Sequence, residues 1–392
     1  MVIAFNRGAI VKILYHHRTQ AEDAQGIHIY EMINAFREIG HEVSMVSLVK
    51  LNQGRTKKEK GKIWEPIAKF VPNFVYEIME IGYNFYGYFL LARSIKKDKP
   101  DFIYERYSLN TFCGVWVSKK FQIPLVLEVN APLYYECQKY GKLFFARFAK
   151  FSERWICSNS FRTIAVTNVM KRMLVKEGVP ESHLIVMHNG INLDEFRTDI
   201  DGCKIRSKYN ITSDKIVLGF VGWFRPWHGL DKILKIFKEK GLGRGGVHLL
   251  LCGDGPAYHD LYEYALQNNL LDYVTFTGGV DRKDVPAYIA AFDIALQPSV
   301  TPYASPMKIF EYIAMGKGVI APKQDNICEI LEDGYNAILF DANDENGLEK
   351  ALITSTETIS YAKKMASAAS KTIIEKEYLW KSNAKKVVDL IS

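Results

Sequence analysis

The stretch S-V-T-P-Y-A-S-P-M-K-I-F-E, from Ser299 to Glu311, joins a short apolar run to a pattern typical of an amphipathic helix. Ser305 and Pro306 are residue types that begin helices, because a hydroxyl can cap free N–H groups and the proline ring presets φ. Lys308 then falls in the first turn, where the helix dipole and the ammonium together favour a phosphate. Glu311 lies further along the same face and could accept hydrogen bonds from sugar hydroxyls. The same residues also fit an ordinary capped helix with a surface Lys–Glu pair.

Outward from this stretch, short apolar runs alternate with helical patterns along nearly the whole chain. The strands expected before residue 196 are Val11–Tyr15, Glu42–Leu48, Asp101–Tyr104, Leu125–Val129, Thr163–Val166 and His183–Met187. Those expected later are Ile216–Val221, Val247–Cys252, Val274–Thr277, Ile294–Gln297 and Val319–Ala321, with helices alone after them. Such alternation predicts parallel sheets with helices on both faces.

The length of 392 residues exceeds one ordinary core, so two domains are expected. A polar segment, Arg197–Ser213, interrupts the alternation and is interpreted as a linker. We therefore predict an α/β protein of two doubly wound, Rossmann-like domains that face each other across a cleft. Their expected bounds are residues 1–196 and 197–377. Ligands of such sheets bind beyond the carboxyl ends of the strands.

Composition and charge narrow the class of protein. The chain is 48% hydrophobic and 24% charged, as globular proteins are. Its 6 cysteines are spread singly, which favours a reducing compartment and argues against a zinc site. Residues 1–10 contain Arg7 but no long apolar run and no A-x-A cleavage site, so we expect no secretion. Residues 1–195 carry 27 Lys and Arg against 19 Asp and Glu, so the net charge of +7 arises from the first half. This half could face nucleic acid, anionic lipid or an anionic substrate, or could be a well-solvated surface.

Two segments of the first half are rich in aromatic residues. Phe74–Ile95 is interrupted by Glu77, Glu80 and Asn84, which makes it a poor membrane span. In Lys139–Arg154 phenylalanines alternate with cations. Both segments fit amphipathic helices at a bilayer surface, and both fit helices that cover a sheet. The sequence leaves these alternatives open.

Three glycine-bearing turns follow predicted strands of the second half, at residues 222–229, 253–256 and 278–280. Glycine there lets the backbone approach a diphosphate or a base, and Arg225 offers a fork of donors. None of these turns matches G-x-G-x-x-G or the Walker A loop, which weakens the dinucleotide and ATPase interpretations.

These residues resemble the large retaining GT-B glycosyltransferases of the glycosyl transferases group 1 family (glycosyltransferase family 4). The most specific part is S-P-M-K-I-F-E-Y, Ser305–Tyr312, followed by A-M-G-K-G-V, Ala314–Val319. Y-E-R-Y-S-L at 104–109, L-E-V-N-A-P at 127–132 and H-N-G-I-N at 188–192 are also similar to segments of this family. The resemblance implies an acceptor-binding N-terminal domain, a donor-binding C-terminal domain, and a last helix, residues 378–392, that packs back on the first.

The resemblance also implies roles for individual residues. The lysine matching Lys308 contacts the donor diphosphate, and the glutamate matching Glu311 holds the donor ribose. We expect Arg225 and His228 to help stabilise the leaving diphosphate and Asn130 to lie beside the reacting sugar. The expected catalytic residues are Lys308, Arg225, Glu311 and Asn130. The expected donor-binding residues are Gly26, Gly222, His228, Gly255, Val280, Ser305, Pro306, Met307, Lys308 and Glu311.

Some positions depart from the family pattern. Many members have two glutamates eight positions apart, whereas this chain has Tyr303 at the first position and Glu311 at the second. His228 stands where a lysine is usual, Trp223 where an arginine is usual, and Asn130 where many relatives have a histidine. These changes affect the atomic roles and the identity of the sugar more than the fold.

We therefore expect an enzyme, a retaining hexosyltransferase that moves a sugar from a UDP- or GDP-sugar to a glycan or polyprenyl-linked acceptor in cell-envelope or exopolysaccharide synthesis. No metal and no obligatory cofactor are expected, and no nucleic acid. We expect a cytoplasmic protein, whose basic N-terminal domain could bind the anionic surface of the inner face of the cell membrane. The alternatives are a GT-B-type nucleotide-sugar epimerase and a non-catalytic GT-B partner subunit.

Overall fold

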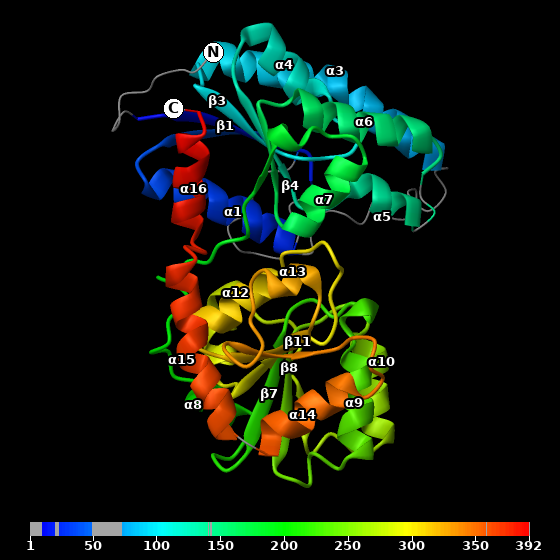
Figure 1. Cartoon of the computed structure of the whole chain (residues 1–392), viewed down its shortest axis with the longest axis vertical. Helices are drawn as coiled ribbons and strands as arrows, with labels where there is room; N and C mark the ends of the chain where they lie inside the picture. Colours follow the sequence, from blue (N-terminus) through cyan, green and yellow to red (C-terminus); the bar gives the residue numbers. More distant parts are fainter. Residues whose placement is uncertain are drawn as a thin grey trace. The chain divides into compact units, whose positions relative to one another are not determined.

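The computed structural model describes residues 10–19, 23–48, 73–139, 141, 143–357 and 359–391, and it divides into two compact units (Figure 1). The first unit comprises Met1–His188, Tyr303–Ser305 and Trp380–Ser392, and the second comprises Asn189–Pro302 and Pro306–Leu379. The break after His188 lies before the predicted boundary at residue 196. The quoted stretch is therefore divided, because Tyr303–Ser305 clusters with the first unit and the helix after it with the second.

The first unit is built on a parallel sheet with the strand order β2-β1-β3-β4-β5-β6. Its strands are β1 Lys12–His17, β2 Glu42–Ser47, β3 Phe102–Arg106, β4 Leu125–Val129, β5 Arg162–Ala165 and β6 Leu184–Val186. Its helices are α1 Asp23–Glu38, α3 Asn73–Asp98, α4 Cys113–Phe121, α5 Leu133–Lys139, α6 Ala146–Asn159, α7 Asn168–Lys176 and α16 Trp380–Asp389. Helix α16 packs against α1.

The second unit repeats the architecture with the order β12-β11-β10-β7-β8-β9, again all parallel. Its strands are β7 Ile216–Val221, β8 Val247–Cys252, β9 Val274–Phe276, β10 Ile294–Leu296, β11 Gly318–Pro322 and β12 Ala337–Phe340. Its helices are α8 Cys203–Lys208, α9 Leu230–Glu239, α10 Tyr258–Gln267, α11 Val285–Ala290, α12 Met307–Ala314, α13 Asp325–Cys328, α14 Gly347–Glu357 and α15 Ile359–Glu375. The predicted α/β class with two Rossmann-like sheets is confirmed.

Three details of the prediction are wrong. The segment of strand β12 was expected to be helical. A run of four residues, A-I-L-F, is too short for its hydrophobic periodicity to distinguish a strand from a helix. The expected linker contains helix α8, whose Arg206 donates to the Ala291 carbonyl and pairs with Asp293. Gly26 was expected just before a helix, whereas it lies inside the first turns of α1.

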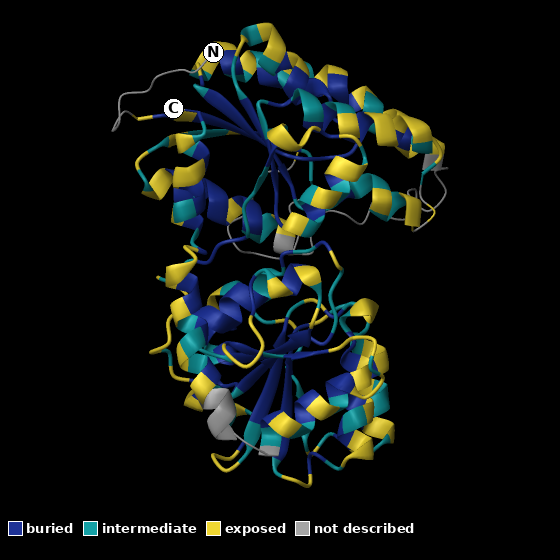
Figure 2. Ribbon diagram, in the orientation of Figure 1, coloured by how far each residue is buried: buried dark blue, intermediate teal, exposed yellow. Residues whose placement is uncertain are grey.

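Alternate residues of the central strands supply the core on opposite faces of the second sheet. In β7, Val217 and Val221 pack on one face, whereas Leu218 and Phe220 pack on the other. Every residue of β8 is buried, and Figure 2 shows the strands as the buried centre of each unit. The register pairs Ile216 with Val247 and continues in step to the last residues of β7 and β8, so these two strands end side by side. The turns after them are therefore neighbours.

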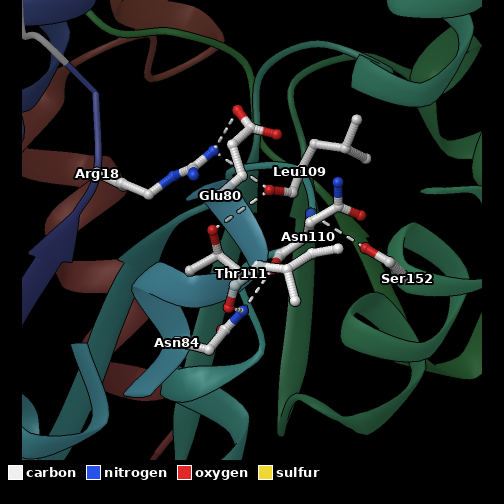
Figure 3. Close-up of polar contacts among 8 residues, drawn as sticks. Arg18, Glu80, Asn84, Leu109, Asn110, Thr111 and Ser152 are labelled. Carbon is white, nitrogen blue, oxygen red and sulfur yellow. Dashed lines mark hydrogen bonds and ion pairs between the residues drawn. The ribbon is translucent and has the colours of Figure 1, made fainter. Parts of the chain in front are cut away.

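In the first unit, the loop between β3 and α4 is held by side chains from other elements (Figure 3). Asn84 of α3 accepts hydrogen bonds from the N–H groups of Phe112 and Cys113 and donates to the Asn110 carbonyl at 2.8 Å. Ser152 of α6 accepts from the Asn110 N–H at 3.0 Å. The N-cap residue of α4, Phe112, provides no side-chain cap, so Asn84 caps this helix from a different one.

We predict that Asn84→Ala lowers the free energy of unfolding of the first unit by about 2–4 kcal/mol, because it leaves buried N–H groups and a carbonyl without this partner. Urea denaturation followed by circular dichroism measures the change. The matched control is Asn343→Ala, since Asn343 is exposed and bonds the nearby Asp341. The control should cost less than about 0.5 kcal/mol. Equal midpoints for the two variants would contradict the capping role.

Candidate functional site

The three predicted glycine turns meet at the carboxyl ends of β7, β8 and β9. The Gly222 N–H donates to the Cys252 carbonyl at 2.9 Å, and Gly253 and Gly278 form an isolated antiparallel bridge. A Cβ added to Gly253, which has a φ of 145°, would lie 1.9 Å from the Gly222 carbonyl oxygen. A side chain is therefore excluded at Gly253, and backbone packs directly on backbone.

Gly255 continues the same packing. A Cβ at this position would lie 2.5 Å from the Phe224 nitrogen, and its φ of 148° disfavours any other residue. The Phe224 N–H donates to the Asp254 carbonyl at 2.7 Å. The turn after β7 is thus tied to the turn after β8 on both sides of Gly253.

Helix α12 brings Lys308 to these turns. The Val221 N–H donates to the buried Tyr312 hydroxyl at 2.9 Å, which holds α12 against the end of β7. The Lys308 Nζ lies 4.0 Å from the ring centre of Phe220, and it would lie 3.2 Å from a Cβ at Gly222. The structure therefore brings together two predicted donor-binding residues, Lys308 and Gly222.

The start of α12 differs from the prediction for Ser305. Pro306 is the N-cap residue, Met307 is the first helical residue, and the N-cap has no side-chain hydrogen bond. Ser305 therefore lies one position before the N-cap residue. Because proline has no hydroxyl, the N-cap residue itself offers no side-chain acceptor to the first-turn N–H groups.

Burial lowers the pKa values of two basic side chains at this site. It lowers the pKa of Lys308 to about 7, although the nearby Glu311 opposes the shift. Burial also lowers the pKa of His228 to about 3, and the charges of Lys308 and Arg225 add to the effect. His228 is consequently neutral near pH 7, and its Nδ1 accepts from the Arg225 N–H at 3.4 Å. A neutral imidazole can form hydrogen bonds with a phosphate but adds no positive charge.

Glu311 has a cationic partner that sequence reasoning missed. Arg282, directly after the third glycine turn, forms an ion pair with the buried Glu311 carboxylate. The guanidinium also lies 4.7 Å from the ring centre of Phe196. The sequence offered one indication that Arg282 belongs to the site, because Arg282 follows Val280, an expected donor-binding residue, by two residues. Val280 itself packs against the core on the α12 side of the sheet.

The first unit gathers a second polar cluster at the ends of its strands. Glu128 of β4 pairs with His28 at 2.8 Å and accepts from the Tyr104 hydroxyl at 2.9 Å and from the Asn130 amide at 2.9 Å. Burial opposes ionisation of Glu128, but His28, Arg106 and the Asn130 amide outweigh it and lower the pKa to about 2. Among the described residues the buried Asn130 Oδ1 has no hydrogen-bond partner.

Tyr303 stands where the first family glutamate was expected, and its hydroxyl donates to the carboxylate of Glu136. Its carbonyl accepts from the Thr167 hydroxyl at 2.9 Å. A phenol therefore stands where the family has a carboxylate, and this phenol donates a hydrogen bond to the carboxylate of another residue. Across the described ranges no group of three or more His, Cys, Asp or Glu could hold a metal ion. Within that same part of the chain no helix could span a membrane.

Comparisons with known proteins identify the family. A family model described as Glycosyltransferase Family 4 matches residues 25–195, and one described as Glycosyl transferases group 1 matches residues 203–372. The uncharacterized glycosyltransferase MJ1069 of Methanocaldococcus jannaschii is 25% identical over 224 residues, which cover 57% of this chain and 56% of that protein. The match thus spans little more than half the length of that relative.

Two further proteins are similar over more of the chain. The alpha-monoglucosyldiacylglycerol synthase of Streptococcus pneumoniae is 23% identical over 297 residues, 73% of this chain and 66% of that protein. The crystal structure of Anabaena HepE in complex with UDP superposes with a TM-score of 0.72 at 18% identity, covering 96% of this chain and 98% of that one. The chain belongs to the glycosyl transferases group 1 family, and its two six-stranded parallel sheets are the Rossmann-like domains of a GT-B fold.

Proposed function

We propose that the protein transfers a sugar from a UDP- or GDP-sugar to a glycan or lipid-linked acceptor in cell-envelope or exopolysaccharide synthesis. The observation that carries the proposal is the position of Lys308, whose ammonium lies against Gly222 at the start of α12. A partly buried cation, the N-terminus of α12 and the glycine backbone at Gly222 form a cradle for a diphosphate. The UDP bound by HepE supports UDP as the nucleotide.

Transfer requires stabilisation of the diphosphate that leaves the sugar. Lys308 and the first-turn N–H groups of α12 would take up this charge, and Arg225 would add a guanidinium to it. His228 would contribute hydrogen bonding from a neutral ring. Because these groups are held in place before the donor binds, little reorganisation is needed when charge develops.

The nucleoside end of the donor would lie toward Glu311 and the third glycine turn. Ribose hydroxyls would donate to the Glu311 carboxylate, which the ion pair with Arg282 orients. The base would lie near the backbone around Val280. Arg282 is thus proposed as a positioning residue for Glu311.

The acceptor and the sugar are assigned to the first unit. The Asn130 Oδ1 is a buried acceptor atom at the carboxyl end of β4, and a sugar hydroxyl could donate to it. Retention of configuration and independence from metal are proposed from the family resemblance. The synthase of S. pneumoniae, named for a glycolipid, supports a lipid-linked acceptor, which would place the protein at the inner face of the cell membrane.

We predict that Lys308→Ala reduces sugar transfer by about 100- to 1000-fold, because one group that stabilises the leaving charge is lost. The measurement is nucleotide release and product formation in a screen of UDP-, GDP- and ADP-sugars. Lys232→Ala, an exposed lysine of α9, is the control and should keep the wild-type rate. Full turnover by Lys308→Ala would refute the assignment, and a wild-type protein that binds none of these donors would refute the function.

Nucleotide affinity should also depend on pH through Lys308. Below about pH 7 the ammonium is already charged, whereas at higher pH the free protein must take up a proton to bind the diphosphate. The affinity for UDP or GDP should therefore fall by up to about tenfold per pH unit above 7, until the pKa of the complex is reached.

Calorimetric titrations between about pH 6 and pH 9, in buffers of different ionisation enthalpy, measure this affinity and the proton uptake. Lys308→Met should bind more weakly at pH 7 and should lose the decline, which separates the lysine from ionisation of the nucleotide. An identical pH profile in both proteins would contradict the role of Lys308.

A further inference from the structure

Helices α3, α4 and α6 of the first unit expose large apolar side chains on their outer surface, which we term the aromatic face. In Figure 1 these helices lie together on one side of the β1–β3–β4 sheet, and Figure 2 shows exposed residues along α3 and α6. Phe85 is 76% exposed, Phe144 66% and Phe89 63%. The residues of the aromatic face are Phe74, Ile78, Phe85, Phe89, Trp116, Phe144, Phe145, Phe148 and Phe151.

Helix α3 buries two polar side chains and exposes apolar ones. Its Glu77 and Asn84 are buried, whereas Ile78 and Phe85, one position further along, are exposed. Glu77 accepts from the N–H groups of Phe144 and Phe145 and so holds the chain just before α6. Leu91 and Ile95 of α3 lie in the core, so apolar side chains occupy both the buried and the exposed side of this helix.

Helix α6 likewise combines buried polar and exposed apolar side chains. Ser152 and Glu153 are buried, and Glu153 accepts from the Tyr134 N–H at 3.0 Å and from the Tyr107 hydroxyl at 3.2 Å. Phe148 and Phe151 of the same helix are exposed. Exposed apolar side chains on neighbouring helices form an apolar patch rather than scattered single residues.

Ring contacts join the helices into one surface. Phe74 of α3 lies 5.7 Å from Phe144, between ring centres, and Phe144 lies 5.0 Å from Phe145. Phe112, at the start of α4, lies 5.8 Å from Trp116 and 5.8 Å from Phe148. The aromatic face thus runs from α3 over α6 to α4.

The charges around this face are almost all positive. Exposed cations on the three helices are Arg93, Lys96, Lys97, Lys119, Lys120, Arg147, Lys150 and Arg154. The acidic groups of these helices are buried or engaged: Glu80 pairs with Arg18, and Asp98 accepts from the Ser94 hydroxyl at 2.8 Å. From the α7 end, Glu177 pairs with Lys150. The surface therefore complements an anionic partner.

We propose that the aromatic face docks on an anionic lipid bilayer, with its rings in the interfacial layer and its lysines and arginines at the head groups. Exposed aromatics bordered by cations are the arrangement that such an interface binds. A second copy of the chain fits less well, because two copies would bring the same positive charge together. This inference rests on the proposed function, because an enzyme with a lipid-linked acceptor has to reach a membrane.

The test is flotation of the full chain with phosphatidylglycerol–phosphatidylcholine vesicles that carry neither acceptor nor nucleotide sugar. The wild type should float at low salt and bind pure phosphatidylcholine at least about tenfold more weakly. The triple variant Phe85→Ser/Phe89→Ser/Phe151→Ser and the triple variant Lys97→Gln/Lys120→Gln/Arg147→Gln should each lose binding by on the order of tenfold or more. All six side chains are exposed, so both variants should keep the wild-type melting temperature.

Matched variants of the second unit serve as controls. Leu266→Ser/Ile374→Ser and Lys232→Gln/Lys238→Gln/Lys371→Gln change exposed residues and should float like the wild type. Failure of the wild type to float at low salt, or flotation of both aromatic-face variants at the wild-type level, would overturn the proposal. The proposal would also be overturned if the wild type formed a dimer that the phenylalanine substitutions dissociate and did not bind vesicles. Donor hydrolysis measured without vesicles should be unchanged in these variants, which separates a failure of docking from a failure of the proposed function.

Discussion

The packing of α12 against the second sheet is the constraint on which the candidate site depends. Ile309, Phe310 and Ile313 are fully buried in the core, and the Val221 N–H donates to the Tyr312 hydroxyl at the end of β7. Lys308 is thereby placed over the Phe220 ring and against Gly222. The arrangement brings a cation into partly buried surroundings before any phosphate is present, and burial then lowers its pKa. The packing of one helix therefore determines both the position of the charge and its pKa.

The glycine turns keep side chains away from the backbone beside Lys308. Gly253 packs its backbone on the Gly222 carbonyl, and Gly255 packs on Phe224, so the surface beside Lys308 carries no side chain from these positions. One turn further along the same face of α12, Glu311 is held by Arg282. The cation, the glycine backbone and the carboxylate thus all lie at the end of β7 or on the helix beside it.

In the first unit, buried polar side chains connect the helices that cover the sheet. Its helices α3 and α6 direct Glu77, Asn84 and Glu153 inward, where each accepts hydrogen bonds from backbone N–H groups. Capping one helix from another locks the helices together, because a buried donor left without a partner is costly. Other apolar residues of these helices, among them Phe85 and Phe151, are exposed. The sequence left core packing and bilayer contact open for these segments, and in the structure each segment has apolar residues both in the core and at the surface.

The sequence by itself determined the class of fold and most of the strands. The bounds predicted for β4, β7 and β8 agree with the structure to the residue, because long buried parallel strands have a distinct apolar pattern. It missed β12 and α8, which are too short for periodicity to identify. Only the tertiary structure decided that His228 is neutral, that Arg282 pairs with Glu311, and that α3 presents its aromatics outward. The physical reason is that a charge state, an ion pair between distant residues and the buried side of a helix all depend on neighbours that local patterns do not specify.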